Sequence, residues 1–283
     1  MTASPSPDNA VASGQRLQTR TVEVAGQRLE VAELSGSADQ APLVLLHEGL
    51  GCVALWRGFP ARLADATGRR VVVYSRAGYG ASDPAARPRQ VDYMHREALQ
   101  VLPAVLDALE VQRPILVGHS DGGSIALIYA GGSGRPVAGL VLLAPHVFVE
   151  QRTLAGIRAA RQAYLHGDLA PRLARYHTDV DNAFWGWNDV WLSPPFADWN
   201  IESYLPAVSA PALVIQGFDD PYGSSAQVDA IAGASGAPVQ TCLLHNCGHS
   251  PHLEQADDTT EAVLSWLDQL GESAAIGPGH RPR

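Results

Sequence analysis

Residues 118–122, Gly-His-Ser-Asp-Gly, carry the strongest sign of chemistry in the chain. An apolar run at 115–117 precedes them and a helical pattern covers 120–130. A sharp strand-to-helix turn of this G-x-S-x-G kind strains the serine backbone and exposes its hydroxyl. Both glycines are needed because a side chain there would collide with the neighbouring strand and helix. We therefore predict that Ser120 is a nucleophile, beside helix N–H groups that would stabilise an anion.

Four further segments follow apolar runs of the sequence. They are 45–51 (Leu-Leu-His-Glu-Gly-Leu-Gly), 75–83 (Ser-Arg-Ala-Gly-Tyr-Gly-Ala-Ser-Asp), 215–221 (Ile-Gln-Gly-Phe-Asp-Asp-Pro) and 246–254 (Asn-Cys-Gly-His-Ser-Pro-His-Leu-Glu). With residues 118–122 they resemble, in chain order, the motifs of the α/β-hydrolase fold family. The resemblance covers about residues 20–270 and implies a serine hydrolase that needs neither a metal nor an organic cofactor.

The resemblance implies a catalytic triad in the order Ser120, Asp220, His249, which is the order of this fold. His249 would take the proton of the serine, and the acid would orient the histidine and stabilise its imidazolium form. The family pattern G-x-x-D selects Asp220, with Asp219 as the alternative that would otherwise be a surface or turn residue. His252 is expected to pack or to face solvent.

The same resemblance places an oxyanion hole at two backbone N–H groups. These belong to Gly49 and to Asp121, the residue after the nucleophile. Glu48 stands where the family usually has glycine, and the sequence leaves two roles open for it: a structural hydrogen-bond acceptor or a pocket residue. The 75–83 loop is interpreted as architectural.

The elements that must position these residues can be read from the hydrophobic pattern. Apolar runs without alternation are typical of parallel strands buried on both faces, and two alternating runs at 21–24 and 28–34 favour an antiparallel hairpin. The near-continuous apolar runs lie at 43–46, 71–74, 115–117, 140–143 and 213–215, and a last run covers 239–244. Helical patterns lie at 56–66, 93–109, 120–130 and 259–270. This rhythm predicts an α/β fold, a mostly parallel twisted sheet with helices on both faces.

One interval breaks the rhythm and divides the chain. Residues 146–210 contain no buried-strand run, so we expect a helical cap inserted into a core formed by 19–145 and 211–270. A disordered lead at 1–18 and a flexible tail at 271–283 would flank them. The insertion is rich in aromatic residues, which either form its own core or line a lid over the site. The candidate pocket residues are Trp185, Trp187 and Trp191, with His146 at a strand end.

Composition excludes several functions. The chain has 283 residues, a net charge of −9, and 20 basic residues that are all arginine. Schiff-base lysine enzymes and lysine-containing phosphate loops are therefore excluded, and nucleic-acid binding is disfavoured. Three cysteines without paired spacing do not predict zinc. Any cation near the pocket must be an arginine, and Arg57 and Arg76 are the first candidates to bind a carboxylate.

The function predicted from these residues is hydrolysis of a carboxylic ester or lactone through an acyl-enzyme. Because the insertion is aromatic, a small-to-medium apolar or aromatic substrate is favoured. Two alternatives remain open: a carbon–carbon bond hydrolase of a ring-cleavage product, and a ligand-binding protein with an unused triad. The fold also permits a cofactor-free perhydrolase side activity. With neither a secretory pattern nor a membrane span, we expect a cytoplasmic protein without membrane partners; the sequence does not decide between monomer and homodimer.

Overall fold

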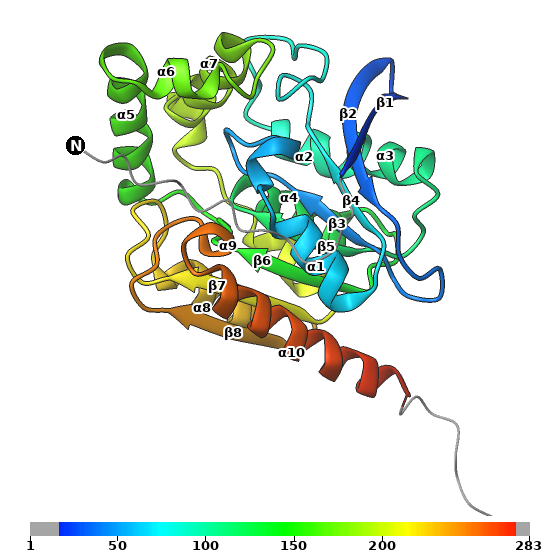
Figure 1. Ribbon diagram of the computed structural model, residues 1–283. Coiled ribbons are helices and arrows are strands. Elements are labelled where there is room, and N and C mark those ends of the chain that lie inside the picture. Colours follow the sequence, from blue (N-terminus) through cyan, green and yellow to red (C-terminus); the bar gives the residue numbers. More distant parts are fainter. Residues whose placement is uncertain (1–16, 276–283) are drawn as a thin grey trace, which may run out of the picture.

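The computed structural model describes residues 17–275 and is built around one eight-stranded sheet (Figure 1). Its strand order is β1-β2-β4-β3-β5-β6-β7-β8. The first two strands form an antiparallel hairpin that joins β4, and all pairs from β4 to β8 are parallel. The strands are β1 Gln18–Val24, β2 Gln27–Leu34, β3 Leu43–Leu46, β4 Val71–Tyr74, β5 Ile115–His119, β6 Gly139–Leu143, β7 Ala212–Gly217 and β8 Val239–Leu244.

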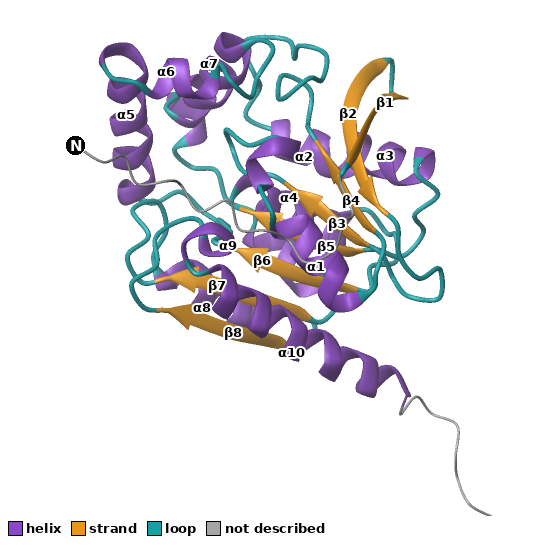
Figure 2. Ribbon diagram, viewed as in Figure 1, coloured by secondary structure: helices purple, strands orange, loops and turns teal. Residues whose placement is uncertain are grey.

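Helices cover both faces of the sheet, as Figure 2 shows. They are α1 Phe59–Thr67, α2 Tyr93–Arg96, α3 Leu102–Ala108, α4 Asp121–Gly132, α5 Gln151–His166, α6 Leu169–Leu173, α7 Val180–Trp191, α8 Ser225–Ala234, α9 Pro251–Glu254 and α10 Ala256–Ala275. Short 3₁₀ helices span Val53–Trp56, Pro194–Phe196 and Glu202–Ala207, and a π-helical turn spans Glu97–Val101. The predicted fold class is confirmed.

The inner strands are fully buried because successive side chains enter two different cores. Val44 and Leu46 of β3 join the core that contains α3 and α4, whereas Leu43 and Leu45 join the core that contains α1 and α10. A strand in this position needs apolar side chains on both faces, which explains its continuous apolar run. No helix in residues 17–275 is both long and apolar enough to span a membrane.

Several elements differ in detail from the sequence prediction. The helix expected at 56–66 begins only at Phe59, because a 3₁₀ turn and Arg57, at φ 54°, precede it. The helical stretch at 93–109 contains a π turn in its middle. The tail expected at 271–283 begins inside α10, which ends at Ala275; residues 276–283 and 1–16 lie outside the described part.

The cap segment, residues 146–210, lies between β6 and β7 and contains α5, α6 and α7 (Figure 1). Its most buried aromatic side chains, Phe184, Trp191 and Phe196, belong to the same apolar cluster as α4 and the sheet. The cap segment therefore packs directly on the core, and part of its aromatic content holds it there.

Candidate active site

Ser120 lies at a strained turn between β5 and α4, with φ 51° and ψ −116°. The strain is held by close packing against the end of β3. A Cβ atom on Gly122 would lie 1.9 Å from the carbonyl oxygen of Leu46, and one on Gly118 would lie 2.3 Å from the carbonyl oxygen of Gly122. The Ser120 N–H donates to the Leu143 carbonyl at 2.9 Å. Both glycines are required because the turn leaves no space for a side chain.

The acid that contacts the candidate base is Asp220. Its Oδ2 atom lies 2.8 Å from Nδ1 of His249 and also accepts a hydrogen bond from Gln216 Nε2 at 2.6 Å. Its Oδ1 atom accepts the N–H groups of Tyr222 at 2.7 Å and Gly223 at 3.3 Å. Asp219, the alternative acid, is exposed. The structure therefore brings together Asp220 and His249, from turns that follow β7 and β8.

The charge state of Asp220 fixes the tautomer of His249. Burial favours the neutral acid, but hydrogen bonding and charge interaction with His249 and the Tyr222 N–H lower the pKa of Asp220 to about 2. An ionised carboxylate can only accept hydrogen bonds, so Nδ1 of His249 carries the proton. The other ring nitrogen, Nε2, is left as the base.

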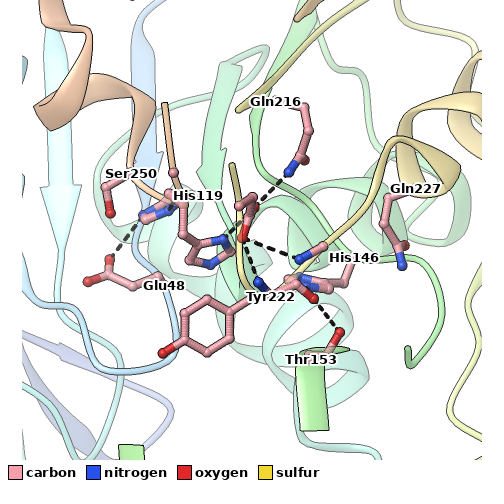
Figure 3. A network of polar contacts seen from close by, with 12 residues as sticks. Glu48, His119, His146, Thr153, Gln216, Tyr222, Gln227 and Ser250 are labelled. Atoms are coloured by element: carbon pink, nitrogen blue, oxygen red, sulfur yellow. Dashed lines mark hydrogen bonds and ion pairs between the residues drawn. The ribbon is translucent and has the colours of Figure 1, made fainter. Parts of the chain in front are cut away.

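His119 connects the serine turn to the histidine loop, and its role was not foreseen in the sequence. Its Nε2 donates to the His249 carbonyl at 2.7 Å, and the two rings lie 5.1 Å apart. Its Nδ1 lies 3.4 Å from Oε2 of Glu48 (Figure 3). Burial opposes ionisation of Glu48, yet the hydrogen bond and charge of His119 hold the pKa of Glu48 well below its usual range. The Glu48 carboxylate thus lies at ion-pair distance from His119, while its side chain stays 28% exposed.

Arg76 is nearly fully buried beneath residues 47–51, which contain the predicted oxyanion donor Gly49 and are called the oxyanion loop below. Its guanidinium donates to the carbonyls of His47 and of Glu48, the latter at 2.9 Å. It also lies 3.8 Å from the carboxylate of Asp121. The carboxylate partner expected for Arg76 is therefore one of the protein's own side chains.

Arg57, the other arginine singled out, is exposed and lies over the ring of Tyr176 at 4.9 Å. The Arg57 side chain therefore contacts Tyr176 of the cap segment. Among residues 17–275, no group of three or more His, Cys, Asp or Glu side chains is arranged to hold a metal ion.

Two of the three candidate tryptophans reach the site. A Cβ on Gly49 would lie 2.1 Å from Nε1 of Trp187, so this indole covers the oxyanion loop. Trp191 lies one helical turn further along α7, and its ring centroid is 5.7 Å from that of His146. Trp185 instead packs on Tyr164 and Phe184 and donates to Asp181, all within the cap segment.

His146 and Tyr222 flank the base. The rings of His146 and Tyr222 lie 5.8 Å and 4.7 Å from the ring of His249. Burial and the neighbouring His249 lower the pKa of His146 to about 4, so its ring is neutral near pH 7. Its Nε2 lies 3.3 Å from the Tyr222 carbonyl, next to the turn that carries Asp220. The sequence prediction had not selected Tyr222, which carries no motif of its own.

The chain is similar in sequence and structure to known hydrolases. A model of the alpha/beta hydrolase family matches residues 43–262. Proline iminopeptidase of Lactobacillus crispatus (strain ST1) is 24% identical over 275 residues, covering 82% of this chain and 92% of that protein. 2-Hydroxymuconate semialdehyde hydrolase of Pseudomonas sp. (strain CF600) is 28% identical over 287 residues, covering 91% and 96%. The enol-lactonase from Burkholderia xenovorans LB400 superposes with a TM-score of 0.68 at 22% identity, covering 88% and 100%. These matches agree on the fold and differ in the substrate that each name states.

Proposed function

The chain belongs to the alpha/beta hydrolase family, and we propose that it is a serine hydrolase that cleaves a carboxylic ester or lactone through an acyl-enzyme. The observation that carries this proposal is the strained Ser120 turn, hydrogen-bonded through His119 to the loop of His249, which in turn contacts Asp220. These are the nucleophile, base and acid that acyl transfer requires.

In the proposed first step, the hydroxyl oxygen of Ser120 attacks the substrate carbonyl carbon while Nε2 of His249 accepts the hydroxyl proton. Asp220 accepts the Nδ1–H bond and stabilises the imidazolium that forms. The imidazolium then gives its proton to the leaving alcohol oxygen, and the carbon–oxygen bond breaks. The products of this step are the alcohol and an ester of Ser120; in a lactone the alcohol stays attached to the acyl group.

In the second step, His249 removes a proton from water, the hydroxide oxygen attacks the acyl-enzyme, and Ser120 leaves as an alcohol after taking that proton. Both steps pass through a tetrahedral oxyanion. The N–H groups of Gly49 and Asp121 are the donors proposed for it, and each such donor typically contributes about 3 kcal/mol to catalysis.

The substrate class proposed is a small-to-medium apolar or aromatic ester. Its support is the set of rings around the base and the oxyanion loop: Trp187, Trp191 and Tyr222. The partly exposed Glu48 carboxylate adds negative charge beside the oxyanion loop and disfavours an anionic group there. The candidate cation Arg76 is already paired, so a carboxylate substrate would lack a free partner in that position.

The proposed function is tested by labelling and by a substrate panel. We expect a fluorophosphonate probe to label the wild type and not Ser120→Ala. A series of p-nitrophenyl esters of rising acyl length is run beside a lactone, a muconate-type semialdehyde and a proline p-nitroanilide. The proposal is supported if an ester or the lactone has a higher kcat/KM than the semialdehyde and the anilide. A wild type that resists the probe, or that turns over only the semialdehyde or the anilide, contradicts it.

Substitution of Trp187 by alanine is expected to shift the acyl-length preference. Removing the indole that covers Gly49 opens space beside the oxyanion loop, so kcat/KM for a long-chain ester should rise about tenfold relative to acetate, in line with the ~1–3 kcal/mol that a few methylenes contribute in a pocket. The matched control is Trp185→Ala on the same helix, whose contacts lie within the cap segment. An equal shift in both variants would mean that the cap as a whole, rather than Trp187, sets the preference.

A further inference from the structure

A chain of buried and part-buried polar contacts joins the cap segment to both proposed oxyanion donors. Nε1 of Trp191 donates to the hydroxyl of Tyr93 at 3.0 Å, and that hydroxyl donates to Oδ2 of Asp121 at 2.5 Å. The same Oδ2 lies 3.8 Å from Arg76, whose guanidinium is bonded to two carbonyls of the oxyanion loop. This network consists of four residues that lie far apart in sequence: Arg76, Tyr93, Asp121 and Trp191.

On one side, this network fixes the direction of the Gly49 N–H. The carbonyl of Glu48 accepts hydrogen bonds from Arg76 at 2.9 Å and from Nδ1 of His47 at 2.7 Å. His47 can donate there because its Nε2 accepts the N–H of Arg76 at 3.0 Å. In a trans peptide the C=O and the following N–H point in opposite directions. Holding the Glu48 carbonyl therefore aims the Gly49 N–H away from Arg76.

On the other side, the network fixes the peptide that carries the second donor. Asp121 is the first residue of α4, so its N–H has no acceptor within the helix. The Asp121 side chain is tied to Tyr93 and Arg76, which resists rotation of the strained peptide at Ser120. Burial raises the pKa of Asp121, against the opposing influence of Arg76. Arg76 also offsets a negative charge that would otherwise repel the oxyanion.

We propose that Arg76 and Tyr93 are positioning residues of the oxyanion hole, and that Trp191 couples them to the cap segment. The proposal rests on the proposed serine hydrolase function. Neither residue is required to touch the substrate. Each acts through the backbone of Gly49 or Asp121, so its loss weakens stabilisation of the transition state more than it weakens substrate binding.

The structure offers a matched pair of substitutions for this test. Tyr93→Phe removes a hydroxyl that donates to the carboxylate of Asp121, and Tyr74→Phe removes a hydroxyl that donates to the carboxylate of Glu97 at 2.7 Å. Both delete one tyrosine-to-carboxylate hydrogen bond to a buried acid. Only the first acid carries a proposed oxyanion donor.

We expect kcat on a p-nitrophenyl ester to fall about tenfold in Tyr93→Phe with KM nearly unchanged, less than the ~100-fold loss on removal of a donor itself. The rate of fluorophosphonate labelling should fall in parallel. The preference for an oxygen ester over its thiono analogue should also drop several-fold, because a C=S group gains less from N–H donors. Tyr74→Phe should keep both kcat and this preference. Its thermal stability should fall less than that of Tyr93→Phe, because the Tyr93 hydroxyl also accepts the hydrogen bond from Trp191.

Arg76→Lys is the second variant, because lysine keeps the charge beside Asp121 but lacks the planar fork that bonds two carbonyls. We expect its kcat to fall at least as far as that of Tyr93→Phe. If Arg76→Lys does not fold, the comparison of Tyr93→Phe with Tyr74→Phe still tests the proposal. Equal effects of Tyr93→Phe and Tyr74→Phe, or an unchanged oxo-to-thiono preference, would overturn the proposal. A wild type that neither reacts with the probe nor hydrolyses esters would instead overturn the proposed function.

Discussion

Replacement of Asp220 by asparagine is expected to lower kcat by about 10⁴-fold, the loss typical when the triad acid can no longer hold the histidine tautomer. Both carboxylate oxygens are surrounded by donors: Oδ1 by the N–H groups of Tyr222 and Gly223, Oδ2 by Gln216 and His249. An asparagine must turn its NH₂ group toward one of these pairs. If the NH₂ group faces His249, it donates to Nδ1, so the ring proton moves to Nε2, the nitrogen that must act as the base. If the NH₂ group faces the backbone, it lies against the two N–H donors of Tyr222 and Gly223.

The neighbouring Asp219→Asn is the matched control. Its side chain is exposed and it removes the same charge one residue away, so kcat should stay within about twofold. The measurement is steady-state hydrolysis of the best ester from the panel, with circular dichroism to verify folding. A large loss in Asp219→Asn together with a small one in Asp220→Asn would reverse the assignment of the acid.

The second large effect is expected from Gly122→Ala, which should destabilise the fold by about 3 kcal/mol or more. The added Cβ would lie 1.9 Å from the backbone oxygen of Leu46, far inside any allowed contact. Relief requires α4 to move away from the end of β3, where the oxyanion loop begins. Activity should therefore fall together with stability.

Urea unfolding measures this effect, with Gly233→Ala as the control. Gly233 lies in α8, and a Cβ there meets nothing within 4 Å. Alanine is the better helix former, so this variant should be neutral or up to about 1 kcal/mol more stable. If Gly122→Ala unfolds at the wild-type urea midpoint, the close packing at the serine turn is not a constraint on this fold.

The local pattern was sufficient to predict the inner strands of the sheet, because these strands need apolar side chains on both faces. The runs at 43–46 and 71–74 coincide with β3 and β4. Helix boundaries were less predictable. The helix expected at 56–66 starts late because Arg57 has a positive φ angle. Arginine as a residue type gives no indication of this backbone conformation. The tail boundary at residue 271 was also misplaced, since α10 continues to Ala275.

Within the cap segment, the sequence prediction treated the three tryptophans alike, and the structure separates them. Trp187 and Trp191 are four residues apart and therefore share a face of α7, whereas Trp185 lies on another face. Periodicity cannot say which face meets the oxyanion loop. That choice depends on where the cap segment rests on the core, through contacts such as Trp187 with Gly49.

The sequence by itself determined the fold class and the candidates for nucleophile, base and acid, because each stands in a short motif that follows a strand of the sheet. Parallel strands bring those motifs to one edge of the sheet. Only the tertiary structure decided that Arg76 pairs with Asp121 and donates hydrogen bonds to the oxyanion loop, and that Glu48 lies beside His119. The physical reason is that the partner of a charged side chain lies on another element of the fold. The number of residues between the two partners in the sequence does not indicate how far apart they lie in space.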